Sequence, residues 1–303
     1  LLDLGLQPGE RVAILCNTRP EWTYADFAIT SAGGVVVPVY PTNSPQECEW
    51  VVGNSEAVAV VCEDAAQVAK IAEVRERLPH LRHVAVVDPS GEVGDAMALD
   101  DLRARGRHGD PAALRARSEA VTPADPFTFI YTSGTTGNPK GCVLTHGNYR
   151  AVLDMIAERR LFEGEDDLIY LFLPLAHAFA LLVQLGAVDI GAPIAYFGGD
   201  TTQIVPEIME VKPTYLPSVP RIFEKLYTKA GQMMPQQLIA AVVSPAVYGG
   251  GPSPPDPTAQ RSADGGAGTS WIVSPPPWRV TFSVSREEEK NAGCSAGGRW
   301  RTK

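Results

Sequence analysis

The sequence lacks any apolar run of the roughly 18 residues that a membrane-spanning helix needs. Cysteine is also scarce, with five residues scattered along the chain and none in a CxxC pair. This usage is typical of a reduced, cytoplasmic protein without structural disulfides or a zinc site. Because no basic partner can be assigned to Cys62 or Cys142, both are predicted to be structural rather than nucleophilic. The start shows neither a signal peptide nor an initiator Met, so we expect the true N-terminus to lie upstream.

Positive charge is in deficit, since 26 Lys and Arg stand against 35 Asp and Glu and give a formal net charge of −9. An acidic protein is a poor partner for nucleic acid, because phosphate backbones bind to a positively charged surface. A small anionic ligand needs only a local positive potential and is not excluded. No basic amphipathic helix is present, so we expect at most a peripheral membrane contact. The sequence gives no prediction of oligomeric state.

From residue 9 to about 230, short apolar runs alternate with helical patterns. Runs that are apolar throughout are typical of strands buried on both faces, and the intervening helices favour a parallel arrangement. We therefore predict an α/β fold in which layers of mainly parallel sheet are flanked by helices. Pro38 indicates that its strand is an edge strand or ends there. The expected strands are 11–16, 35–40, 57–62, 83–88, 127–132, 168–174, 192–197 and 214–218.

Helix boundaries are marked by capping signals. Pro20 suits the first turn of a helix that follows the first strand, and Ser44 with Glu47 forms a capping box before another. A charged helix is expected at about 65–78, and the segment 89–125 is predicted to be a surface excursion.

The composition changes after about residue 234. Residues 245–303 contain 8 Pro and 9 Gly, a share associated with low-complexity or disordered sequence. We predict a partial large domain at 1–234 and a Pro/Gly-rich tail at 235–303 that is disordered or frame-shifted. A natural flexible tail is the alternative.

The stretch FIYTSGTTGNPKGCVLTHGN, residues 129–148, is the most informative part of the sequence. An apolar strand leads into a loop of glycines and hydroxyl side chains, and a helix capped near Asn148 is expected to follow. This layout is typical of phosphate binding, because glycine lets several backbone N–H groups converge on one anion. The hydroxyls add donors, and Lys140 adds a positive charge.

The loop matches neither of two common nucleotide-binding patterns. A Walker A loop needs Gly, four residues and then Gly-Lys-Ser/Thr, whereas Gly134 and Gly137 are three apart and Pro139 precedes the lysine. The GxGxxG pattern occurs nowhere in the chain. A P-loop kinase or ATPase is therefore disfavoured, and on composition alone a plain surface loop remains an alternative.

Residues 131–141, YTSGTTGNPKG, resemble the phosphate-loop signature of the adenylate-forming superfamily, which includes acyl-CoA synthetases, luciferases and peptide-synthetase adenylation domains. The resemblance covers residues 5 to about 234. Within the superfamily, YPTNSP and PSVPRIFEKLY resemble long-chain fatty acyl-CoA synthetases. Other similar segments are PGERVAILCNTRPEW, GGVVVPVYPTNSPQECEWVVGNSEAVAVVCED, LFLPLAHAFALLVQLGAVDIGAPIAYF and KPTYLPSVPRIFEKLY.

The resemblance implies an AMP-forming ligase. Family members join a carboxylate to ATP, release pyrophosphate and pass the acyl group to a thiol, commonly that of CoA, with Mg²⁺ expected to assist. Because the first step brings two anions together, amides, hydroxyls, a metal ion and a lysine must offset the charge. The lysine is therefore a catalytic candidate as well as a ligand. By motif position, the residues that hold the β- and γ-phosphates are Thr132, Ser133, Gly134, Thr135, Thr136, Gly137 and Lys140.

The resemblance also implies an acyl side. His177, the second catalytic candidate, lies by family position near the acyl carboxylate, and Phe179 lies beside the acyl pocket. Taken alone, His177 is more simply interpreted as a histidine packed at a loop. Ser218 and Arg221 either lie near the acyl channel or are merely a strand end and a helix start. His146 is assigned to the turn into the helix after the phosphate loop.

Some motifs of the family are not found in the sequence. There is no adenine-side aromatic followed by Thr-Glu, whose Glu helps to hold Mg²⁺, no ribose-binding Thr-Gly-Asp, and no hinge or C-terminal domain with its catalytic Lys. We therefore expect weak or no acyl adenylation by this chain alone. The alternative function is that of a non-catalytic nucleotide- or acyl-binding fragment, or a pseudoenzyme.

Overall fold

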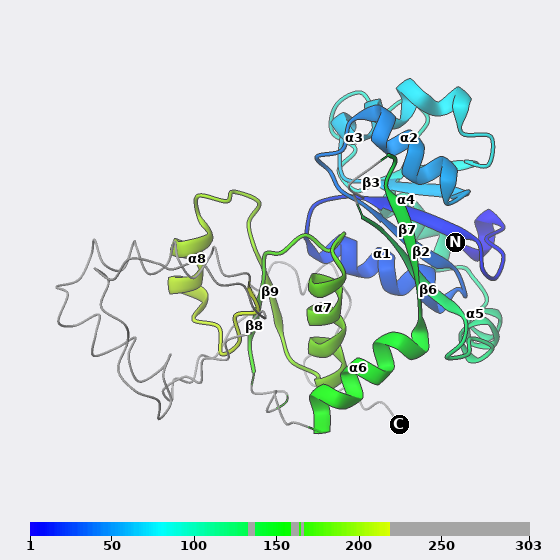
Figure 1. Ribbon diagram of the computed structural model, residues 1–303. Helices are drawn as coiled ribbons and strands as arrows, with labels where there is room; N and C mark the ends of the chain where they lie inside the picture. Colours follow the sequence, from blue (N-terminus) through cyan, green and yellow to red (C-terminus); the bar gives the residue numbers. More distant parts are fainter. Residues whose placement is uncertain (133–136, 159–163, 165–166, 219–303) are drawn as a thin grey trace, which may run out of the picture. The chain divides into compact units, whose positions relative to one another are not determined.

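The structure is a computed structural model that describes residues 1–132, 137–158, 164 and 167–218 (Figure 1). The chain divides into two units, Leu1–Met234 and Pro235–Lys303, and every described residue belongs to the first. The predicted tail at 235–303 lies outside the described residues, so its interpretation stays a prediction.

Within the described residues, seven strands form one sheet in the order β5-β4-β3-β1-β2-β6-β7. Neighbouring strands are parallel except β6 and β7, which are antiparallel. The prediction of a mainly parallel sheet is confirmed, and β1, β2 and β3 are buried along almost their whole length. The strands are β1 (Arg11–Leu15), β2 (Val35–Val39), β3 (Ala59–Cys62), β4 (His83–Val86), β5 (Met97–Ala98), β6 (Pro126–Thr132) and β7 (Lys140–Thr145).

Helices cover both faces of this sheet, and the alternation of side chains along each strand supplies a core to each face. In β1, Val12 and Ile14 join the cluster that packs α1, α6 and α7. Ala13 and Leu15 join the cluster that packs α2 and α3. These helices are α1 (Pro20–Ser31), α2 (Pro45–Asn54), α3 (Ala65–Val74), α6 (His146–Glu158) and α7 (Ala178–Ile190).

The capping predictions for the first two helices are confirmed. Pro20 is the first residue of α1. In α2 the Ser44 side chain accepts the Glu47 N–H, while the Glu47 carboxylate accepts the Ser44 N–H. The excursion at 89–125 folds into β5, α4 (Leu99–Gly106) and α5 (Pro111–Glu119), and neither helix has a buried residue.

Of the two alternatives predicted from Pro38, the edge strand is wrong, because β2 lies inside the sheet between β1 and β6. The physical reason is that β6 pairs with β2 at a single position, Val36 with Thr128. This ladder ends before Pro38, so the missing N–H of the proline interrupts no pairing with β6. The strand end fits, since β2 ends at Val39, one residue after Pro38.

A second, two-stranded parallel sheet is formed by β8 (Ile169–Leu171) and β9 (Ile194–Tyr196). Tyr215, from the predicted strand 214–218, adds one parallel bridge to Ile169. Figure 1 shows α7 beside these strands, and α8 (Ile204–Val211) packs Ile204 against Tyr170 and Phe172.

A buried polar network joins α1 to α7 and β9. The Thr23 hydroxyl donates to Gln184 Oε1 at 2.6 Å and lies 2.6 Å from the Tyr196 hydroxyl. Gln184 Nε2 donates to Asp26 Oδ2 at 2.7 Å. Asp26 is fully buried, and its Oδ1 has no hydrogen-bond partner in the described part of the chain. Burial raises the pKa of this carboxyl to about 7, although the hydrogen bond from Gln184 opposes the rise.

Asp26→Asn should make the free energy of unfolding less dependent on pH. The carboxyl ionises near pH 3.8 when unfolded and near 7 when folded. Stability is therefore fully present at low pH and falls as the pH rises from about 4 to about 7. Each pKa unit corresponds to roughly 1.4 kcal/mol, so the loss is on the order of a few kcal/mol.

Urea unfolding at about pH 5 and about pH 8 measures this effect. The difference in the free energy of unfolding between the two pH values should be smaller in Asp26→Asn than in the unmodified chain. It should persist in Thr23→Val, which keeps the carboxyl. The same pH difference in Asp26→Asn and in the unmodified chain would contradict the assignment.

Candidate functional site

The phosphate-loop segment joins two antiparallel strands. β6 ends at Thr132 and β7 begins at Lys140, and these two residues pair in register. The predicted order of strand, loop and helix is therefore wrong, because β7 comes before α6. Val143 and Thr145 are β-branched and favour extended backbone, and β6 offers a free edge for pairing. Four predicted phosphate ligands lie outside the described residues: Ser133, Gly134, Thr135 and Thr136.

Helix α6 begins after the hairpin, at His146, so the predicted cap near Asn148 is three residues late. Thr145 is the capping residue, and its hydroxyl accepts the Asn148 N–H at 3.2 Å. Asn148 Oδ1 accepts the Thr145 N–H in return, at 2.9 Å, which is a capping-box arrangement. His146, predicted to lie in the turn into the helix, is the first residue of α6 itself. Because the helix dipole acts only over the first turn, the six residues of β7 separate its positive end from the loop.

The described end of the loop presents a free positive charge. The Lys140 side chain is exposed and makes no ion pair with the described residues. Gly137 has a φ of 85°, which glycine adopts without strain. Thr132 is also exposed, at the last position of β6. An exposed lysine at the mouth of a hairpin loop can pair with an anion at little desolvation cost.

Helix α2 holds this hairpin from the side. Trp50 Nε1 donates to the Pro139 carbonyl at 2.8 Å, and the Tyr131 hydroxyl donates to Asn54 Oδ1 at 2.7 Å. A Cβ at Gly141 would lie 3.0 Å from Tyr131 Cζ, so a larger residue there would press on the ring that lies across the paired strands. Sequence reasoning missed these contacts, although Trp50 and Asn54 stand four apart on one helix face.

His177 caps the start of α7. The ring Nδ1 accepts the Phe179 backbone N–H at 3.2 Å. The backbone N–H of His177 donates to the Pro174 carbonyl at 2.9 Å. Because Nδ1 accepts, a neutral ring carries its proton on Nε2. The residue is exposed, so this N–H faces outward as a donor. The structure thus gives His177 a structural role and leaves it one donor for an oxygen ligand.

Thr18 ties the His177 loop to the main sheet. Its hydroxyl donates to the Leu173 carbonyl at 2.7 Å and accepts the Leu175 N–H at 3.1 Å. Thr18 follows the carboxyl end of β1, and Thr132 is the carboxyl end of β6. Since β1, β2 and β6 are parallel, Thr18 and the phosphate loop lie at the same edge of the sheet, where ligands of α/β proteins bind. The loop that carries His177 follows β8 of the second sheet, and Thr18 holds it at this edge. Lys140 and His177 share no hydrogen bond within the described residues. Sequence reasoning missed Thr18.

The other acyl-side candidates are placed in part. Phe179 is the second residue of α7, and 39% of it is exposed. Ser218 is partly buried and ends the described part of the chain, while Arg221 lies outside it. Their proposed roles at the acyl channel stay predictions.

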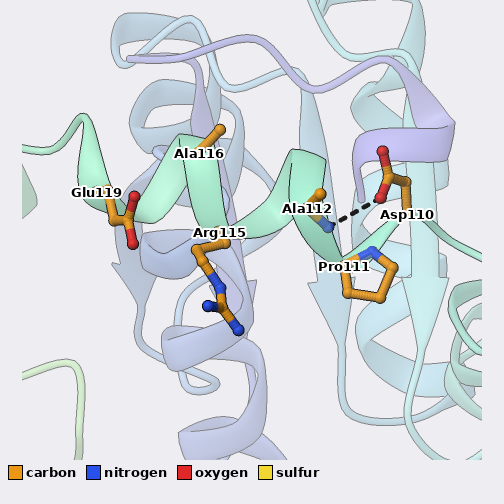
Figure 2. Close-up of a pocket in the computed structure, with 6 residues that line it drawn as sticks. All are labelled: Asp110, Pro111, Ala112, Arg115, Ala116 and Glu119. Atoms are coloured by element: carbon orange, nitrogen blue, oxygen red, sulfur yellow. Dashed lines mark hydrogen bonds between the residues drawn. The ribbon is translucent and has the colours of Figure 1, made fainter. Parts of the chain in front are cut away.

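The surface of the described residues is hollowed beside two of the helices. One hollow, of about 500 Å³, lies along α5, where the Asp110 carboxylate accepts the Ala112 N–H at 2.8 Å and caps the helix (Figure 2). It contains none of the predicted site residues. Another, of about 600 Å³, lies beside α2 and is lined by both Trp50 and Asn138, so it adjoins the base of the phosphate loop.

Cys16, Cys48 and Cys62 are buried and free, and burial raises the pKa of the Cys62 thiol to about 12. This fits the structural role predicted for Cys62, but Cys142 is exposed on β7 and contributes nothing to the core. Over the described residues, no three His, Cys, Asp or Glu side chains come together as a metal site. No helix in that part of the chain is both long and apolar enough to cross a membrane.

A sequence model of the AMP-binding enzyme family matches residues 1–268. The chain belongs to this family. The match passes the domain boundary expected near residue 234, which stays a prediction. Long-chain-fatty-acid–CoA ligase FadD15 of Mycobacterium bovis is 40% identical over 233 residues, which are 77% of this chain and 38% of that protein. The chain thus spans well under half the length of this relative.

Solved structures agree with the fold. The inhibitor-bound N-terminal domain of FACL13 from Mycobacterium tuberculosis is 26% identical, with a TM-score of 0.59, over 74% of this chain and 53% of that one. ATP-bound MatB from Rhodopseudomonas palustris is also 26% identical, with a TM-score of 0.58, over 75% and 42%. The predicted large-domain architecture of adenylate-forming enzymes is confirmed.

Proposed function

We propose that this chain carries the phosphate-binding and acyl-binding parts of an AMP-forming ligase that activates a long-chain fatty acid with ATP and passes it to CoA. The observation that supports this most directly is that Thr18, which follows β1, holds the His177 loop at the sheet edge where β6 ends and the Lys140 hairpin emerges. The likeness to a long-chain-fatty-acid–CoA ligase supports the choice of acid. ATP-bound MatB supports a nucleotide ligand for the same fold.

Each described residue takes a defined role in this proposal. Lys140 pairs with phosphate oxygens as a positive charge on the strand side of the loop, and the Thr132 hydroxyl adds a donor. His177 donates from Nε2 to the acyl carboxylate, while Phe179 lends an exposed apolar ring to the acyl chain. Serine and threonine hydroxyls suit a loop that must also release pyrophosphate, because they bind without a net charge.

The described part of the chain contains no cluster of carboxylates that could bind Mg²⁺. No residue is therefore assigned to Mg²⁺ in this proposal. ATP, fatty acid and CoA are the proposed small-molecule partners, with no nucleic acid and at most a peripheral membrane contact. The buried free thiols support a reducing, cytoplasmic location. A non-catalytic phosphate- or acyl-binding module is the second candidate, since the Lys140 hairpin needs no turnover in order to bind an anion.

Lys140→Ala should weaken binding of inorganic pyrophosphate by about 10- to 100-fold, the range for loss of a charged hydrogen bond. Isothermal titration calorimetry on the full chain measures the affinity. Arg115→Ala removes an exposed cation from α5 and should leave the affinity unchanged. Equal affinities for Lys140→Ala and the unmodified chain would count against the assignment of the loop.

Exchange of labelled pyrophosphate into ATP separates the two candidates. With a long-chain fatty acid present, we expect exchange by this chain to be weak or absent, because the adenine-side Thr-Glu and ribose-side Thr-Gly-Asp motifs are not in its sequence. Exchange at an ordinary enzymatic rate would overturn this expectation. Weak exchange that depends on the fatty acid would favour the ligase over the binding module, whereas pyrophosphate binding without any exchange is compatible with both.

A further inference from the structure

We propose that Trp50 is a positioning residue for the phosphate loop, because its indole N–H fixes the peptide that precedes Lys140. This inference rests on the proposed function, since it assigns Trp50 to the same anion site. The donor and acceptor are 89 positions apart in sequence and 2.8 Å apart in space. The contact is therefore a product of the fold and not of local chain geometry.

The hydrogen bond from Trp50 to the Pro139 carbonyl fixes the orientation of the peptide that leads into Lys140. The Pro139 carbonyl and the Lys140 N–H belong to one rigid, planar unit, and the proline ring fixes its own φ. Holding the carbonyl therefore sets the direction in which the chain enters β7, where Lys140 is the first residue. A lysine side chain is long and flexible, so the placement of its backbone decides which anions it can reach.

A second tie from the same helix holds the other strand. Asn54, one turn after Trp50, accepts the Tyr131 hydroxyl, and Tyr131 pairs with Gly141 across the hairpin. Helix α2 thus holds the hairpin on both sides of the loop, at Tyr131 before it and at Pro139 after it.

The helix that supplies these ties is firmly seated. Cys48, Val51 and Val52 of α2 are buried in the core on the face of the sheet that α2 and α3 cover. Glu49 of the same helix also forms an ion pair with Arg77 at 2.9 Å. Trp50 itself remains 36% exposed. A tryptophan with this exposed fraction contributes little buried surface to the core. Its indole N–H instead donates to a backbone carbonyl of the loop.

The indole signal of Trp50 provides a direct test. The chain has five tryptophans, and ¹⁵N-labelled protein gives an indole N–H signal for each, with Trp50 identified by its loss in Trp50→Phe. Adding inorganic pyrophosphate should shift the Trp50 signal. Trp22, whose buried Nε1 has no partner among the described residues, should not respond. A Trp50 signal that stays fixed while pyrophosphate binds would overturn the inference.

Affinities provide the second test. Trp50→Phe keeps an aromatic ring but loses the donor, and should weaken pyrophosphate binding about three- to tenfold. Gln46→Ala is the matched control, because Gln46 lies one turn earlier on α2 and bonds to Glu73 instead of the loop. In a Lys140→Ala background, Trp50→Phe should cause no further loss, since both changes act on one contact.

The outcomes separate the two proposals. If Lys140→Ala weakens binding but Trp50→Phe matches Gln46→Ala, the positioning role fails and the proposed function stands. If Trp50→Phe weakens binding equally with and without Lys140, its effect does not pass through the lysine and the inference is overturned. If the unmodified chain binds no pyrophosphate, the proposed function fails, and the inference fails with it.

Discussion

The fully buried carboxyl of Asp26 forms a polar contact between α1 and α7, inside the apolar cluster that packs the two sheets together. Burying a polar group costs free energy unless it is hydrogen-bonded, and Gln184 of α7 supplies that bond to α1. Thr23 extends the contact to Tyr196 of β9. Since α7 begins at the cap formed by His177, the same helix carries both this buried polar contact and the exposed histidine.

Within the described part of the chain, the sheet and the loop contacts have different roles. The parallel strands set the edge at which loops emerge, and short polar ties then fix each loop to that edge. Thr18 fastens the His177 loop through two hydrogen bonds, while α2 fastens the hairpin that begins β7 with Lys140. Each tie uses two hydrogen bonds, those of Thr18 to backbone groups of its loop and those of α2 to the Pro139 carbonyl and the Tyr131 hydroxyl.

The sequence predicts best what is local. Pro20 and the Ser44–Glu47 box mark their helices, and unbroken apolar runs mark strands buried on both faces. The glycine-rich loop is recognisable for the same reason, because its residues act together over a short span. Strand β7 escapes prediction because its formation depends on a free edge of β6, and a helical pattern follows at once.

The contacts that escape prediction altogether are those between distant positions. Thr18 bonds to Leu173, 155 positions away, and Asp26 to Gln184, 158 positions away. Each partner is an ordinary residue in its own segment, so no local pattern marks it. The interior position of β2 escapes prediction for a related reason, because the sheet tolerates Pro38 only where the ladder with β6 has ended.

Strand β7 is the last strand of the seven-stranded sheet, and most of its residues are exposed, including 52% of Val143. Along its outer side, the backbone donors and acceptors have no strand to pair with in the described part of the chain. Such an edge is a template on which another extended segment can add. Among the described residues, the strand that begins with Lys140 is therefore open to pairing with an added extended segment.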